Sequence, residues 1–243
     1  MMSKNLEKFF TAFILLPLCL FLIPSIIFWS PKSYQQISCD LIALILVIIS
    51  NKNWLHVEVN FFSGKRPFNQ FLNAIPALVL LLLTKNPFVL SIKNPVLMSF
   101  MTILMIAICE EYIYRGILIP LGLRLTNNRL FISVLISSIG FAFAHIVNFE
   151  HGSFLVILSQ IILAFATGML FGTLYLKSKN LSLVIVLHFI SDLPLLASNG
   201  SATVLNNSQT YGILMIVLVI SLIACLISLV QLHRFSKKSS PIT

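Results

Sequence analysis

The sequence predicts an all-α fold, a polytopic membrane helix bundle with about eight transmembrane helices and both termini in the cytoplasm. Of its 243 residues, 58% are hydrophobic and only 9% are charged, whereas a soluble domain carries roughly 25% charged residues. The apolar residues form long runs, and the basic residues lie in the short segments between them. This composition excludes a soluble enzyme, a DNA-binding protein and a disordered chain. We expect residues 1–243 to form one integral-membrane domain.

A helix that crosses the hydrocarbon core of a bilayer, ~30 Å thick, needs about 20 apolar residues. Eight segments approach or meet this length, and the second and third are the shortest. The predicted spans are 9–29, 37–50, 70–84, 95–118, 130–148, 154–176, 181–197 and 211–232.

The distribution of positive charge supports this count of spans. With a cytoplasmic N-terminus and eight crossings, 13 of the 16 Lys and Arg residues fall on the cytoplasmic side, and Lys32, Lys85 and Lys93 fall on the other. The ratio becomes 12 to 3 if Arg115 lies within the membrane. Cytoplasmic loops of membrane proteins carry such an excess, so the sequence predicts a multi-pass protein of the cell membrane.

Ionisable side chains occur at three places in the apolar runs, although each costs several kcal/mol at the centre of a bilayer. The first place contains Glu110, Glu111 and Arg115. Glu111 and Arg115 are four residues apart on one helix face, so we expect an ion pair. Glu110 points about 100° away, and a buried carboxylate without a full partner is suited to general-base chemistry. A structural salt bridge between helices would explain the same residues.

The second place is His145, which follows small and aromatic residues. A lone histidine on an apolar helix is more often a packing residue, but these neighbours would also let it face an interior cavity.

The third place is the pair His188 and Asp192, which again share a helix face. Aspartate can fix the tautomer of a neighbouring imidazole, and a simple polar contact would explain the pair equally well.

Together the three places supply a set sufficient for a base, an orienting group and an oxyanion donor in acyl chemistry. The same set is sufficient to bind a divalent metal. At about 1.5 Å per residue, Glu110 and His145 lie roughly 21 and 22 Å from the cytoplasmic ends of their helices. His188 lies only about 10 Å deep. It can therefore meet Glu110 and His145 only if the seventh helix is tilted or longer than predicted. If the fourth helix ended early at Pro120, the depths of Glu110 and His145 would no longer agree.

Other polar, small and sulfur-containing residues are expected to be structural. Asp40 is near the start of the second span, and we expect it at the membrane interface. Gly168 and Gly172 form a GxxxG pattern that permits close helix contact, which we expect within the chain rather than in a dimer. The four cysteines form no CxxC pair, and we expect free structural thiols.

Three motifs with ionisable residues follow one another on successive hydrophobic segments within residues 95–195. They are Glu110-Glu111-x-x-x-Arg115, Phe141-x-x-x-His145 and His188-x-x-x-Asp192. This order resembles the CPBP family of intramembrane proteases, which includes the type II CAAX prenyl endopeptidases and bacteriocin-processing or self-immunity proteins. The resemblance implies an eight-helix fold with a catalytic chamber inside the membrane.

The resemblance also implies roles for these residues. Glu110 would activate a water molecule with help from His145, while Glu111 and Arg115 would support the site. The oxyanion would be stabilised by His188 and by residue 192, where the family often has asparagine. Because an ionised aspartate only accepts hydrogen bonds, we expect Asp192 to act through His188.

Members of this family have been described both as metalloproteases and as metal-free, glutamate-dependent proteases. The sequence contains no HExxH zinc motif. A divalent metal such as zinc, if present, would bind Glu110, His145 and His188. We favour metal-free glutamate chemistry.

The sequence therefore predicts an intramembrane endopeptidase that hydrolyses a peptide bond of a membrane-associated peptide or protein. One alternative is a non-catalytic bacteriocin immunity or tolerance protein that binds a membrane-active peptide. Another is a small transporter or proton relay, since these also use intramembrane carboxylates and histidines. The expected partners are the lipid bilayer and a peptide or protein substrate, without nucleic acid. Nothing in the chain implies a prenylated CAAX substrate.

Overall fold

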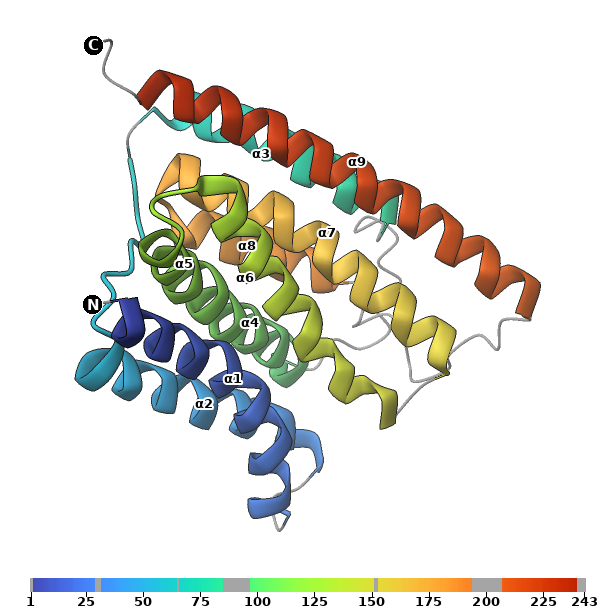
Figure 1. Ribbon diagram of the computed structural model, residues 1–243. Coiled ribbons are helices and arrows are strands. Elements are labelled where there is room, and N and C mark those ends of the chain that lie inside the picture. Colours follow the sequence, from blue (N-terminus) through green and yellow to red (C-terminus); the bar gives the residue numbers. More distant parts are fainter. Residues whose placement is uncertain are drawn as a thin grey trace.

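The computed structural model describes residues 2–28, 32–64, 66–84, 97–150, 153–193 and 207–239, and every regular element in these ranges is a helix (Figure 1). The α-helices are α1 (Met2–Ile26), α2 (Lys32–Ser50), α3 (Pro67–Thr84), α4 (Leu97–Glu111), α5 (Ile119–Leu125), α6 (Leu130–Ala144), α7 (Phe154–Ser178), α8 (Leu181–Asp192) and α9 (Asn207–Ser239). Two π-helices, η1 (Asn51–Leu55) and η2 (Tyr112–Leu118), and a 3-10 helix, η3 (His145–Glu150), extend α2, α4 and α6. The predicted helical bundle is confirmed.

Seven of the eight predicted spans are apolar helices of 18 to 29 residues in the described part of the chain. The second and third, Tyr34–Leu55 and Pro67–Thr84, are longer than predicted because the helices continue beyond the apolar runs. The remaining one, the seventh predicted span (181–197), contains α8, which has 12 residues. At 1.5 Å per residue this helix is about 18 Å long, too short to cross the bilayer by itself. Residues 194–197 of that prediction lie outside the described residues.

The fourth span continues without interruption through α4, η2 and α5, from Leu97 to Leu125. A proline in an α-helix collides with the carbonyl group four residues earlier. For Pro120 this is the carbonyl of Gly116, which lies in the wider turn of the π-helix η2. The helix therefore passes Pro120, as the depth estimate for Glu110 requires.

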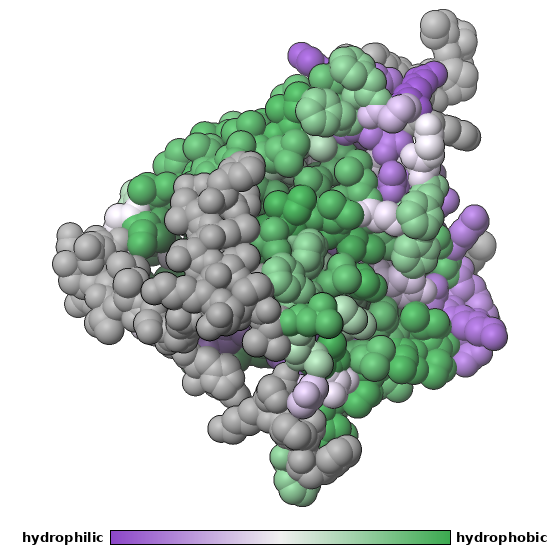
Figure 2. All heavy atoms as spheres, turned by 180° about the vertical axis from the view of Figure 1, so that it is seen from behind, coloured by the Kyte–Doolittle hydropathy of each residue, from purple (hydrophilic) through white to green (hydrophobic). Residues whose placement is uncertain are grey.

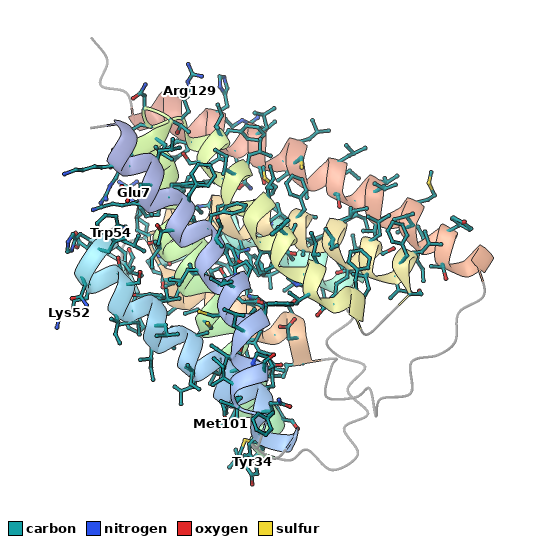
Figure 3. All side chains as sticks on the ribbon, turned by 60° about the horizontal axis from the view of Figure 1, so that its bottom comes forward. Glu7, Tyr34, Lys52, Trp54, Met101 and Arg129 are labelled. Atoms are coloured by element: carbon teal, nitrogen blue, oxygen red, sulfur yellow. The ribbon has the colours of Figure 1, made fainter. Side chains whose placement is uncertain are left out.

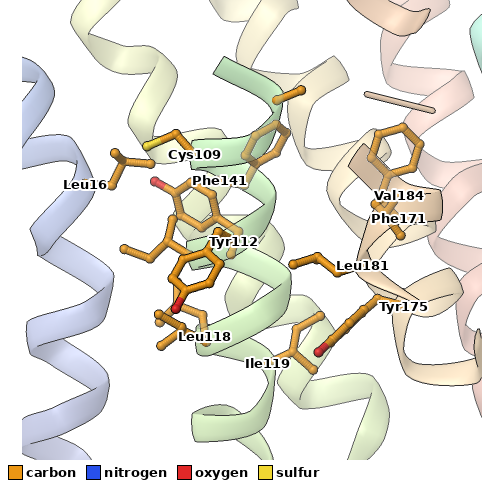
Figure 4. Close-up of a cluster of buried hydrophobic side chains, with 14 of the residues drawn as sticks. Leu16, Cys109, Tyr112, Leu118, Ile119, Phe141, Phe171, Tyr175, Leu181 and Val184 are labelled. Atoms are coloured by element: carbon orange, nitrogen blue, oxygen red, sulfur yellow. The ribbon is translucent and has the colours of Figure 1, made fainter. Parts of the chain in front are cut away.

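The helices form a layered bundle in which α1 and α2 lie on one side, α3 and α9 lie on the other, and the remaining helices lie between them (Figure 1). The central helix α7 packs against α6 and α9, and α4 packs against α2 and α8. Buried aliphatic and aromatic side chains from α1, α4, η2, α7 and α8 form the core (Figure 4). On the outer surface of α9, Met215, Leu222 and Leu226 are 62–66% exposed. Such a surface is suited to lipid, and the chain is a multi-pass membrane protein.

The two ends of the bundle differ in charge. The start of α1 and the end of α9 lie at the same end, on the left in Figure 1. Figure 3 shows Lys52 and Arg129 toward this end and Tyr34 and Met101 toward the other. We call the first the basic end, because it carries the described basic side chains other than Arg115. They are Lys4, Lys8, Lys52, Arg66, Arg124, Arg129, Lys177, Lys179 and Arg234.

Hydrophilic atoms accordingly gather along one edge of the surface, on the right in Figure 2, while the rest of the visible described surface is largely hydrophobic. Arg115 is 1% exposed inside the fourth span, so it belongs to neither side of the charge count. Lys65, Lys85 and Lys93 lie outside the described residues. That the basic end faces the cytoplasm stays a prediction from its charge.

The GxxxG pattern in α7 forms close contacts within the chain, as predicted. A Cβ atom added at Gly168 would lie 2.9 Å from the Cβ of Ser138, and one added at Gly172 would lie 2.9 Å from Cγ1 of Val134. Both neighbours belong to α6, so the two glycines let α6 and α7 pack closely. The four cysteines are free thiols.

Candidate active site

Two adjacent glutamates end α4, and Arg115 follows one turn later in η2. The predicted pair is confirmed, because Arg115 Nη1 lies 2.8 Å from Glu111 Oε1 and both side chains are at most 1% exposed. The guanidinium carbon of Arg115 lies 4.3 Å from the ring centroid of Phe141 and 5.7 Å from that of Phe171. Cation–π contacts and one carboxylate therefore surround this buried cation.

Helix α8 places His188 against the carboxylates of α4. Its Nδ1 lies 2.7 Å from Glu111 Oε1, and because an ionised carboxylate only accepts, Nδ1 is the donor. Its Nε2 lies 3.5 Å from Glu110 Oε2 and 3.3 Å from Asp192 Oδ2. One oxygen of Glu111 thus connects Arg115 to His188, and each ring nitrogen of His188 faces a carboxylate.

His188 reaches this position although its place in the sequence indicates a shallow depth. The first turn of α8 is covered by the linker between η1 and α3. The amide of Leu181 donates to the carbonyl of Asn60 at 3.0 Å, and the amide of Ser182 donates to that of Phe61 at 2.9 Å. Leu181 is completely buried. The sequence estimate placed Leu181 at the exposed end of the bundle, whereas the linker packs over the start of α8 and buries this residue.

His145 lies where α6 gives way to η3. Its Nδ1 is 3.0 Å from the carbonyl oxygen of Phe141, so Nδ1 donates, and Nε2 of the neutral ring is an acceptor. The ring of Phe141 lies between the two histidines, with its centroid 5.1 Å from that of His145 and 5.8 Å from that of His188.

Glu110, His145, His188 and Asp192 line one cavity of about 870 Å³. This volume lies within the range of ligand-binding pockets, about 300–1,000 Å³. A carboxylate and two imidazoles from three helical segments therefore lie around one pocket. Glu111 and Arg115 are not part of the lining. The catalytic role of each residue remains a proposal.

Asp40 belongs to the lining of the candidate site. This residue is 3% exposed and lines the same cavity as Glu110, whereas its depth relative to the membrane interface stays a prediction. Its Oδ2 accepts a hydrogen bond from Gln36 Nε2 at 2.9 Å. The prediction started the second span at residue 37, but α2 begins at Lys32, which places Asp40 two turns inside the helix. Gln36 and Asp40 are four residues apart on one helix face, and this spacing could have indicated that the two side chains interact inside the bundle.

The cavity residues do not fit a metal ion in this arrangement. Within the described ranges, no group of three or more His, Cys, Asp or Glu side chains is placed to hold one. The proposed function therefore assigns every step to the protein groups alone.

Comparison with family models gives one match. Residues 92–194 match the model described as type II CAAX prenyl endopeptidase Rce1-like. This segment contains all three motifs of the candidate site, and the match confirms the resemblance to CPBP proteases. A search of curated proteins finds no match to the chain.

Proposed function

We propose that this chain, whose residues 92–194 match the Rce1-like protease family, is a glutamate-dependent intramembrane endopeptidase of the cell membrane. Its substrate is a membrane-associated peptide or protein. The observation that carries the proposal is the unequal environment of two neighbouring carboxylates. Glu111 is held by Arg115 and by His188 Nδ1 at 2.7–2.8 Å, whereas Glu110 lines the cavity and lies farther from His188, with Oε2 3.5 Å from Nε2.

In this proposal Glu110 is the general base. A water molecule in the cavity donates a proton to the Glu110 carboxylate while its oxygen attacks the carbonyl carbon of the scissile peptide bond. His145 accepts a hydrogen bond from the same water molecule through Nε2 and orients it. The proton on Glu110 then passes to the leaving amine. A positioned general base contributes about 10²- to 10⁴-fold to the rate.

The oxyanion of the tetrahedral intermediate is stabilised by His188. A proton on each ring nitrogen makes this side chain a cation, with Nδ1 bound to Glu111 and Nε2–H directed into the cavity. Asp192 holds this orientation through its contact with Nε2, at 3.3 Å, and does not itself donate to the oxyanion. Loss of one such donor costs about 10²- to 10³-fold in rate.

The test replaces Glu110 with glutamine, which keeps the size and polarity of the side chain but removes the base. We compare the N-terminal ends of membrane and exported proteins from cells that carry wild-type or Glu110→Gln protein, and measure the cleavage rate of the identified peptide with purified protein. We expect a loss of at least about 100-fold in kcat. Both proteins should elute identically from a size-exclusion column.

Glu7→Gln is the matched control, because Glu7 is an exposed glutamate near the basic end of α1 (Figure 3). It should cleave at the wild-type rate. Full cleavage by Glu110→Gln would contradict the proposal.

A further inference from the structure

The cavity occupies one half of the bundle. The helices α1, α6 and α8 start at the basic end, and the last residues of each line the cavity. The helices α2 and α7, and the fourth span that α4 begins, run toward the basic end, and earlier or middle residues of each line the cavity. The lining stretches are 20–25 in α1, 35–40 in α2, 106–110 in α4, 141–148 in α6 and η3, 160–171 in α7, and 188–192 in α8. The cavity therefore extends from the middle of the bundle toward the end opposite the basic end, which we call the far end.

The rim of the cavity at the far end is polar. Ser25 and Gln160 are exposed and line the cavity. Asn148 Nδ2 donates to Gln160 Oε1 at 3.1 Å, which connects η3 to α7 beside the opening. Gln35 Nε2 donates to the carbonyl of Pro24 at 3.5 Å, which connects α2 to α1. Amide and hydroxyl groups around an opening are suited to water and to a peptide backbone.

On the side of the basic end, the same helices are tightly packed. Ile117, Leu118 and Leu121 are completely buried, and the close contacts of Gly172 with Val134 lie at this level. The linker covers the first turn of α8 through the backbone hydrogen bonds of Leu181 and Ser182. Among the described residues, the lining of the cavity ends at this layer: Phe171, next to Gly172, belongs to it, and no residue from 111 to 140 or from 172 to 187 does.

We propose that the substrate enters the cavity from the non-cytoplasmic side of the membrane. The excess of Lys and Arg predicts that the basic end is cytoplasmic, and the cavity extends to the opposite end. The peptide segment that is cut has thus already crossed the membrane, as in an exported peptide or an extracytoplasmic segment of a membrane protein, and is not a cytoplasmic tail. That a substrate enters the cavity rests on the proposed function. The side of the membrane to which the cavity opens does not depend on it.

The first experiment measures access without requiring activity. Single cysteines are introduced at Ser25, on the rim, and at Asn128, in the exposed turn between α5 and α6 at the basic end. Cys39 lines the cavity, so both variants are made in a Cys39→Ala background, which is the unlabelled control. The proteins are expressed in bacterial spheroplasts and treated with a charged, membrane-impermeant maleimide.

We expect Ser25→Cys to be labelled in intact spheroplasts and Asn128→Cys only after permeabilisation. Gln160→Cys provides a second rim position if Ser25→Cys fails to fold. Labelling of the rim cysteines only after permeabilisation, with Asn128→Cys labelled in intact spheroplasts, would overturn the proposal.

The second experiment uses the cut ends that disappear in the Glu110→Gln strain. Cut ends in extracytoplasmic or exported segments support the proposed direction of access. Cut ends in cytoplasmic segments overturn it and leave the protease assignment intact. If no cut end depends on Glu110, the proposed function fails, and the maleimide result alone decides the direction of access.

Discussion

The two halves of the bundle are built from the same helices but are packed in opposite ways. From Gly168 toward the basic end, Gly168 and Gly172 bring α7 into close contact with α6. Toward the far end, the same two helices contribute Gln160 and Phe141 to the lining of the cavity of about 870 Å³. Small residues let the helices pack closely on one side of this level, and larger polar and aromatic residues line a cavity on the other.

This difference separates the residues that hold the helices together from those that we expect to perform chemistry. The boundary between the halves is the pair of Glu111 and Arg115, which is buried behind the cavity. His188 contacts Glu111, and Phe141 and Phe171 contact Arg115, so these three lining residues connect the pair to the cavity. Substitutions in the packed half should therefore lower stability, substitutions in the cavity should lower activity, and substitutions at the boundary should lower both.

The largest loss of stability is expected at the boundary. Arg115→Met removes the cation beside Glu111 and, among the described residues, leaves this buried carboxylate with the contact to His188. Breaking a buried ion pair from one side costs about 3–5 kcal/mol. The free energy of unfolding, measured by denaturation of the purified protein in detergent, should fall by this amount. The double variant with Glu111→Gln should recover part of the loss because no unpaired charge remains; a double variant less stable than Arg115→Met would contradict the role of the pair.

A smaller loss is expected in the packed half. A methyl group at Gly168 would meet Ser138 Cβ at 2.9 Å and its Cα at 3.1 Å, so α6 and α7 must move apart. We expect Gly168→Ala to lower the free energy of unfolding by about 1–3 kcal/mol in the same denaturation experiment. Gly212→Ala is the matched control, because a methyl group added at Gly212 would meet no atom within 4 Å, and it should not destabilise the protein. Equal stability of the two variants would show that the packed half tolerates looser contact.

The smallest effect is expected inside the cavity. Asp192→Asn retains an oxygen that accepts from His188 Nε2, so kcat/KM for the identified peptide should change by less than about tenfold, which is 1.4 kcal/mol. Asp192→Ala removes the acceptor and should lose more activity while it remains as stable as the wild type. If asparagine and alanine reduce cleavage equally, Asp192 does not act through His188.

The local features of the site could be predicted from the sequence, whereas those set by distant contacts could not. The pair of Glu111 and Arg115 follows from a spacing of four residues on one helix. That Asp40 lines the cavity was not predicted, because α2 begins with polar residues that an apolar window leaves out. No pattern along the chain indicates that the carbonyl of Asn60 binds the first turn of α8, so the depth of His188 could not be read from the sequence.

The contact between this linker and α8 determines which changes the site can tolerate. The linker uses the carbonyl groups of Asn60 and Phe61, and α8 uses the amides of Leu181 and Ser182. Because these groups belong to the backbone, replacing the side chains of the linker leaves them in place. Inserting or deleting a residue there would instead shift the imidazole of His188 relative to α4. The linker should thus vary in composition among related chains but keep its length.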